Sequence, residues 1–152
     1  MACLTACFSP IAFGQGKNPA SESETEKIIA QGRVYCLDES GQRLSENRDC
    51  STGSHTYELV SKDKKVFKFA ADDLLTAMFK ESRVRKLDLQ ITGEPRANNF
   101  LEITNIQTIR DGKLIDIFYY CDVCSITALG PGDCPCCFNP LEYREKPALE
   151  KP

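Results

Sequence analysis

Nine cysteines in a chain of 152 residues restrict what this sequence can fold into more than any other feature. Four of them form the pattern C-x2-C-x9-C-x2-C near the C-terminus: Cys121, Cys124, Cys134 and Cys137. A gap of two residues lets both thiolates of a pair point inward, and two such pairs supply the four tetrahedral ligands that zinc prefers. A Gly-Pro-Gly segment at 130–132 can fold the second pair back onto the first. The pattern therefore predicts a site for zinc or another thiophilic metal ion.

The residues around these pairs carry a second pattern. An aromatic residue precedes the first pair, and the second pair lies in a Pro-Gly-x-Cys-Pro-x-Cys segment with a leucine nearby. This arrangement is similar to the short heavy-metal-binding domain of bacterial metal-handling proteins. The matching residues are Tyr119, Cys121, Pro131, Gly132, Cys134, Pro135, Cys137 and Leu141.

Three positions depart from that domain. Cys124 stands where the family has His, Asp122 where it has Pro, and Phe138-Asn139 where it has Gly-Met. The loss of the His and the Met argues against copper trafficking, because these residues accompany thiolates in many copper sites. It favours a closed site of four sulfur ligands.

Disulfide bonds are the competing interpretation of the cluster. If the chain is exported and its first segment is removed, Cys36, Cys50 and five clustered cysteines remain, and this odd number leaves one thiol unpaired within the chain. Cys36 and Cys50 are predicted to form a disulfide that closes the loop after the first strand. An iron–sulfur cluster is a weaker alternative, and covalent haem is excluded because no Cys-x-x-Cys-His segment occurs.

Cys136 is the fifth cysteine of the cluster and lies between Pro135 and Cys137. We expect it to point away from the four-sulfur site. It is interpreted as a fifth ligand for a thiophilic ion, as an exposed reactive thiol or, more simply, as a tolerated cysteine.

The N-terminal segment predicts export. Residues 1–16 contain no charged residue and resemble the apolar part of a secretory signal, with residues 12–14 as a small-x-small cleavage site. The positive charge expected near the start is missing. If the true start lies upstream, residues 4–7 resemble a lipoprotein signal, and Cys7 would carry the lipid. We therefore expect a secreted or periplasmic protein, with a buried N-terminal segment of a cytosolic protein as the alternative.

Regions of different composition divide the rest of the chain. Residues 17–27 are rich in Ser and Glu and are predicted to form a flexible leader, and residues 145–152 are predicted to be a disordered tail. Residues 28–120 are expected to form a β-barrel and residues 121–144 a cysteine-rich knuckle. No apolar run approaches the about 18–20 residues that a membrane-spanning helix needs.

The middle of the chain alternates apolar and polar residues with the period of a strand. Strands are predicted over residues 32–38, 55–60, 65–69, 87–92, 100–110 and 113–120. Asp111-Gly112 predicts a type I′ turn, and a phase slip predicts a bulge near Thr104-Asn105. On the last strand Ile115, Ile117 and Tyr119 share one face, which we expect to pack on the barrel or the knuckle.

One helix interrupts the strands. Leu74, Leu75 and Met78 form an apolar stripe that predicts a helix over about residues 72–81, with Asp72 or Asp73 as its cap. The order of elements over residues 30–112 resembles the OB-fold, a small Greek-key barrel. We predict a mainly β fold with an OB-like barrel of five to six strands and one helix; an SH3-like barrel and a small β-sandwich are alternatives.

The single histidine and a set of basic and aromatic residues are further candidates for binding or catalysis. His55, the only histidine, is interpreted as a packed or solvated residue. A net charge of −3 and a pI near 5.3 argue against a general nucleic-acid binder. An OB-like face could still bind single strands through a basic patch and stacking aromatics. The candidate residues for that role are Lys62, Lys64, Lys65, Arg83, Arg85, Lys86, Tyr35, Tyr57, Phe67 and Phe69.

The leading functional prediction is an exported module that carries a structural four-cysteine metal site and binds a protein or small ligand. The sequence has no Gly-rich phosphate loop, nucleophile elbow or metalloprotease motif, so we expect no enzymatic activity. One alternative is a periplasmic thiol/disulfide redox protein that uses the Cys-x-x-Cys pairs. The other is a nucleic-acid-binding OB domain.

Overall fold

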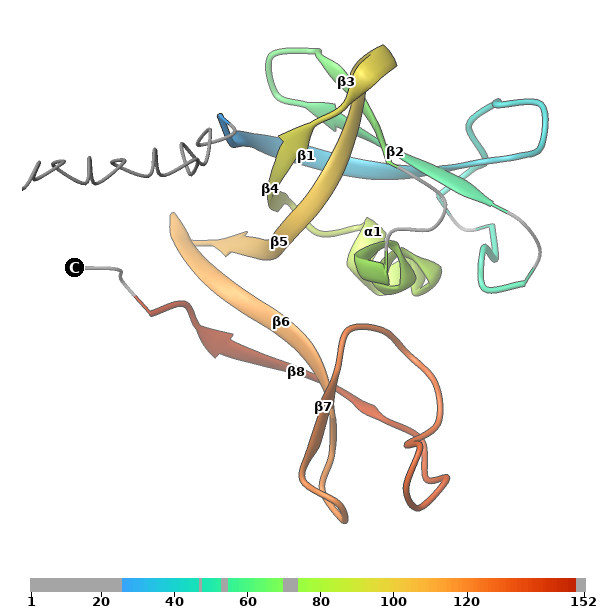
Figure 1. Cartoon of the computed structure of the whole chain (residues 1–152), viewed down its shortest axis with the longest axis vertical. Coiled ribbons are helices and arrows are strands. Elements are labelled where there is room, and N and C mark those ends of the chain that lie inside the picture. The colour runs from blue at the N-terminus through green and yellow to red at the C-terminus, as the bar shows by residue number, and fades with distance from the viewer. Residues whose placement is uncertain (1–25, 47, 53–54, 70–73, 150–152) are drawn as a thin grey trace, which may run out of the picture.

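A computed structural model of the chain describes residues 26–46, 48–52, 55–69 and 74–149 (Figure 1). The elements are β1 (Ile28–Leu37), β2 (Thr56–Ser61), β3 (Val66–Phe69), the 3-10 helix η1 (Leu74–Lys80), α1 (Ser82–Arg85), β4 (Leu89–Pro95), the 3-10 turn η2 (Ala97–Asn99), β5 (Phe100–Arg110), β6 (Lys113–Cys121), β7 (Ile126–Ala128) and β8 (Glu142–Pro147). The signal-like segment, most of the leader and the predicted helix cap at Asp72 or Asp73 lie outside the described residues.

Five strands close into a barrel, seen in the upper half of Figure 1. β1 pairs with β2 on one side and β4 on the other, β2 pairs with β3, and β4 pairs with β5, all antiparallel. A short parallel pairing of β3 with β5 completes the ring. This strand order confirms the predicted mainly β fold with an OB-like Greek-key barrel.

Alternating apolar side chains fill the barrel, as the period of the strands requires. Leu59, Ile91 and Leu101 come from different strands and are fully buried. Phe79 of η1 enters this core from the side, with its ring centroid 5.4 Å from that of Phe69 and 5.6 Å from that of Tyr57. Gly32 lets β1 approach β2 closely, because a Cβ atom there would lie 2.0 Å from the Val60 carbonyl oxygen.

Two local predictions for the strands are confirmed. Asp111 and Gly112 have φ values of 51° and 73°, as a type I′ turn demands. The β4–β5 register passes from Thr92 opposite Asn105 to Gly93 opposite Ile103, so Thr104 is the extra residue of a bulge.

Other boundaries are corrected by the structure. β1 begins at Ile28 rather than residue 32, and β4 continues through Gly93 to Pro95 because the bulge in β5 absorbs the irregularity. The predicted helix is a 3-10 helix followed by one α-helical turn. In a 3-10 helix residues i and i+3 eclipse, which buries Thr76 together with Phe79. No helix in the described ranges is long and apolar enough to cross a membrane.

The C-terminal part of the chain extends the same sheet below the barrel (Figure 1). The start of β6 pairs with β5, and the rest pairs with β8 on one edge and, over residues 119–121, with β7 on the other. The predicted packing face of β6 is confirmed for Ile117 and Tyr119, which are buried in the core, whereas Ile115 is only half-buried and is not part of it. β8 was expected to be knuckle and disordered tail; Glu145, Lys146 and Pro147 instead pair with β6. We call residues 121–144 the cysteine module.

Candidate metal centre

Four cysteines converge where β6 ends. Cys121 is the last residue of β6, Cys124 lies just before β7, and Cys134 and Cys137 lie between β7 and β8. Their sulfur atoms all lie within 4.8 Å of one another. Cys121 and Cys134 are buried, whereas Cys124 and Cys137 are only half-buried. The structure therefore brings together the four cysteines of the C-x2-C-x9-C-x2-C pattern.

The two Cys-x-x-Cys segments have the same backbone turn. The amide of Ser125 donates to the Cys121 carbonyl oxygen at 2.8 Å, and the amide of Phe138 donates to the Cys134 carbonyl oxygen at 2.9 Å. Ser125 and Phe138, the residues after each second cysteine, have φ values of 55° and 59°. Both are left-handed conformations that a non-glycine residue seldom adopts. The two segments are thus equivalent knuckles.

Backbone amides also point at the first sulfur of each knuckle. The amides of Cys124 and Val123 donate to the Cys121 sulfur, and those of Cys137 and Cys136 donate to the Cys134 sulfur. These hydrogen bonds favour the thiolate over the thiol. The amides of Cys137 and Cys136 lower the pKa of Cys134 to about 7. The fold thus prepares a negative sulfur at a buried position.

The closeness of the thiols to one another has the opposite effect and raises the pKa values of Cys121 and Cys124. For Cys121 the amides lower the pKa, but burial and the nearby Cys137 and Cys134 thiols outweigh them and the pKa is raised. The contacts of Cys124 with Cys136 and Cys137, together with burial, raise the pKa of Cys124 well above its usual range. A divalent cation would remove this conflict, because it neutralises thiolates that otherwise repel one another.

The spacing of the sulfurs fits a metal ion better than disulfides. The Cys121 and Cys137 sulfurs are 3.5 Å apart. A tetrahedral zinc ion with bonds of about 2.3 Å places its sulfur ligands about 3.8 Å apart, whereas a disulfide requires about 2.0 Å. All five cysteines from Cys121 to Cys137 carry free thiols. The donor set and its spacing therefore fit a soft, tetrahedral cation.

The cysteine module is fastened to the barrel through η1 and α1. The Tyr119 hydroxyl donates to the Glu81 carboxylate, and the Arg83 guanidinium lies over the Tyr143 ring at 4.9 Å from its centroid. Gly130 is packed so closely on η1 that a Cβ atom there would lie 2.7 Å from the Cβ of Ala77. The site is therefore held against the folded core.

The Tyr119–Glu81 contact allows one test of this attachment. Tyr119→Phe is expected to lower the free energy of unfolding by about 2 kcal/mol, because it removes a largely buried hydrogen bond to a charged group. The measurement is urea denaturation of the metal-loaded protein. Tyr120→Phe is the matched control, because the Tyr120 ring lies on the outer face of the same strand, under Arg144. Equal effects of the two substitutions would contradict the attachment.

Cys136 stands apart from the four. It is exposed and is not a member of the group whose sulfurs lie within 4.8 Å of one another. Its side chain nevertheless lies near the Cys124 thiol of the other knuckle and helps to raise the pKa of that thiol.

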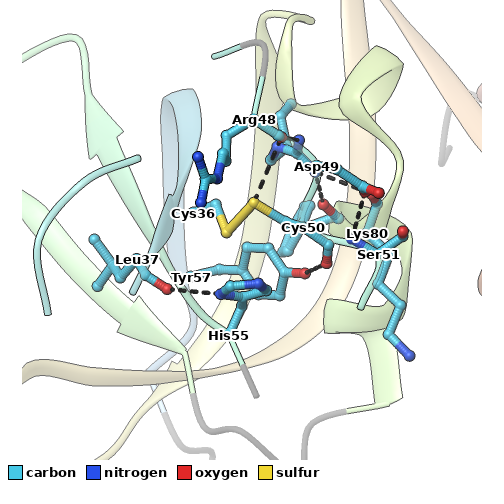
Figure 2. The surroundings of a disulfide bond; sticks show 11 residues. Cys36, Leu37, Arg48, Asp49, Cys50, Ser51, His55, Tyr57 and Lys80 are labelled. Atoms are coloured by element: carbon cyan, nitrogen blue, oxygen red, sulfur yellow. Dashed lines mark hydrogen bonds between the residues drawn. A yellow bond between two sulfur atoms is a disulfide. The ribbon is translucent and has the colours of Figure 1, made fainter. Parts of the chain in front are cut away.

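The second cysteine pair lies in the barrel part of the chain, outside the cysteine module. Cys36 of β1 and Cys50 of the following loop form a disulfide, drawn in Figure 2. The Tyr57 hydroxyl donates to the Cys50 carbonyl oxygen at 3.2 Å, and His55 Nδ1 lies 3.3 Å from the Leu37 carbonyl oxygen. His55 comes within 4.8 Å of both sulfurs, but a disulfide offers no thiolate to a metal ion.

Three of the candidate residues for nucleic-acid binding are buried in the structure. Tyr57 and Phe69 are buried in the core and cannot stack on bases. Arg85 is buried as well and donates to the carbonyl oxygens of Phe79, Lys80 and Arg48; its burial lowers its pKa. The sequence alone does not distinguish a buried arginine from a surface arginine, because the same five N–H groups can donate to backbone carbonyl oxygens or to an external ligand.

Comparison with known proteins adds nothing to this description: no family model, curated protein or solved structure matches the chain. The site is therefore interpreted from its own geometry.

Proposed function

We propose that Cys121, Cys124, Cys134 and Cys137 hold one zinc ion in a closed, structural site of an exported binding module. The observation that carries this proposal is the equivalence of the two knuckles, each with two amides aimed at a buried first sulfur. Four thiolates complete the tetrahedral shell of zinc, so the site keeps no open position for catalysis. The role assigned to the ion is to hold the cysteine module together.

Export is supported by the presence of both a disulfide and a cluster of free thiols in the same chain. The Cys36–Cys50 disulfide is typical of proteins that work in an oxidising compartment. Free thiols close together would oxidise there, and a bound metal ion would protect them. We therefore place the protein in the periplasm or outside the cell.

The binding part of the proposal is supported by a groove of about 1000 Å³ between the barrel and the segments 112–115 and 147–149. Apolar side chains such as Ile29 and Leu114 and polar side chains such as Asn105 and Gln107 line it. This volume and mixed lining suit a small ligand. The proposal assigns the groove no chemistry beyond binding.

The experiment measures zinc and free thiols on protein purified under native conditions. One zinc ion per chain is expected, together with thiols that react slowly until a chelator is added. Cys134→Ser is expected to abolish zinc binding, because it removes a buried ligand. Cys136→Ser is the matched control from the same knuckle and is expected to keep the zinc.

Two results would contradict the zinc site. One is zinc content that survives Cys134→Ser, and the other is a native protein in which the four cysteines are paired in disulfides. Cys124→Ser needs a companion variant, since Cys136 lies close enough to substitute for the missing ligand. The double variant Cys124→Ser/Cys136→Ser removes that substitution and is expected to lose the zinc.

A thiol/disulfide redox protein is the second candidate. The observation in its favour is the lowered pKa of Cys134, because a thiolate is the attacking species in disulfide exchange. The burial of the Cys134 side chain opposes it, since a substrate disulfide must reach the sulfur. Metal-free protein with disulfide reductase activity that disappears in Cys134→Ser would favour this candidate.

A further inference from the structure

The two knuckles differ at one position that matters for their chemistry. The second middle residue is Val123 in the first knuckle and Cys136 in the second, and both side chains are exposed. The backbone amides of both residues donate to the first sulfur of their own knuckle. The turn therefore requires only an amide there, and the exposed thiol of Cys136 is additional to the four-sulfur site.

Cys136 is the accessible member of the cluster. Cys121 and Cys134 are buried, and Cys124 and Cys137 are half-buried and would be bound to the metal. Redox-sensing cysteines are typically solvent-accessible and lie next to a second cysteine that can form a disulfide with them. An oxidant from solvent would thus reach Cys136 before the other thiols.

The partner of Cys136 follows from its surroundings. The Cys136 side chain lies near the Cys124 thiol of the other knuckle, which is half-buried and within 4.8 Å of the sulfurs of Cys134 and Cys137 on either side of Cys136. Cys137 is adjacent in sequence, but neighbouring residues seldom meet the separation of Cα atoms that an unstrained disulfide needs. Cys124 is therefore the partner that the geometry favours.

We propose that Cys136 makes the metal site sensitive to hydrogen peroxide, by forming a disulfide with Cys124 that removes one of the four ligands. This inference rests on the proposed zinc site. It adds a regulatory role: the module is held together under resting conditions and released by peroxide.

The chemistry balances with one peroxide molecule. The Cys136 sulfur attacks one peroxide oxygen, an S–O bond forms as the O–O bond breaks, and the departing hydroxide takes the thiol proton and leaves as water. The Cys124 sulfur, which leaves the metal ion as a thiolate, then attacks the sulfenic acid of Cys136. An S–S bond forms, the S–O bond breaks, and the departing hydroxide takes a proton from solvent and leaves as water. One thiol and one thiolate lose two electrons, which reduce one peroxide to two waters.

The experiment follows zinc release from the loaded, full-length protein with a chromogenic chelator after peroxide is added. Cys136→Ser is expected to slow release by about tenfold or more, because the remaining thiols are shielded by burial or by the metal. Val123→Ser is the matched control at the equivalent position of the other knuckle and should release zinc at the wild-type rate. Peptide mapping should find a Cys124–Cys136 disulfide, and a thiol reductant should restore zinc binding.

Each outcome bears on one claim. Equal release from wild type and Cys136→Ser, or a disulfide that excludes Cys136, would overturn the sensor while leaving the zinc site intact. Absence of zinc from the wild-type protein before any peroxide is added would instead overturn the proposed function. The zinc content of Cys136→Ser before oxidation shows that the variant has folded its site.

Discussion

Removal of the metal ion is expected to unfold residues 121–144 and leave the barrel folded. Ordering this segment costs backbone entropy, which its contacts and the bound ion must offset. Its own apolar contribution is small, since only Ala128, Leu141 and Tyr143 among its residues pack partly buried against the core. Structural zinc sites contribute about 10–16 kcal/mol, so the ion supplies much of what holds the segment in place.

The measurement is hydrogen exchange before and after addition of a chelator. Loss of protection should be confined to residues 121–144, which contain β7, the two knuckles and the start of β8. Amides of buried barrel residues such as Leu59 and Ile91 should keep theirs, because their core lies within the ring of five strands. Readdition of zinc is the control and should restore protection. Equal loss across residues 30–110 would show that the module and the barrel fold as one unit.

The barrel could be predicted because its signals are local. The alternation of apolar and polar residues predicts the strands, and the Asp111-Gly112 turn predicts a hairpin. A one-residue slip in that alternation predicts the bulge at Thr104. The closing pairing of β3 with β5 is parallel and joins distant segments, so no local pattern encodes it. Only the resemblance of the element order to the OB-fold implies that the barrel closes in this way.

The candidate site was predicted in part for the same reason. The spacing of the cysteines named the four sulfurs that converge, since two knuckles need only a short linker to meet. The left-handed backbone conformation of Ser125 and Phe138 could not be predicted from the sequence, because glycine or asparagine normally occupies such positions. β8 was missed because Glu142, Arg144 and Lys146 are charged and Tyr143 alone contributes a large apolar side chain.

Loss of the Cys36–Cys50 disulfide is expected to destabilise the barrel by about 3 kcal/mol. The two cysteines are 14 residues apart, and closing a loop of that size restricts the unfolded chain by about this amount. The test is the double variant Cys36→Ala/Cys50→Ala, which spares the thiols of the cysteine module. Urea denaturation of the metal-loaded protein should show a lower midpoint.

The native fold of the loop should survive this change. Two hydrogen bonds of this loop do not involve the sulfur atoms. The Arg85 guanidinium donates to the Arg48 carbonyl oxygen at 2.9 Å, and the Tyr57 hydroxyl donates to the Cys50 carbonyl oxygen (Figure 2). These hydrogen bonds hold the loop on α1 and β2 without the covalent link. The zinc content of the double variant should therefore equal that of the wild type, because the disulfide and the knuckles lie in separate parts of the structure. A loss of zinc would show that the barrel disulfide and the metal site are coupled, and an unchanged midpoint would show that the disulfide contributes nothing to stability.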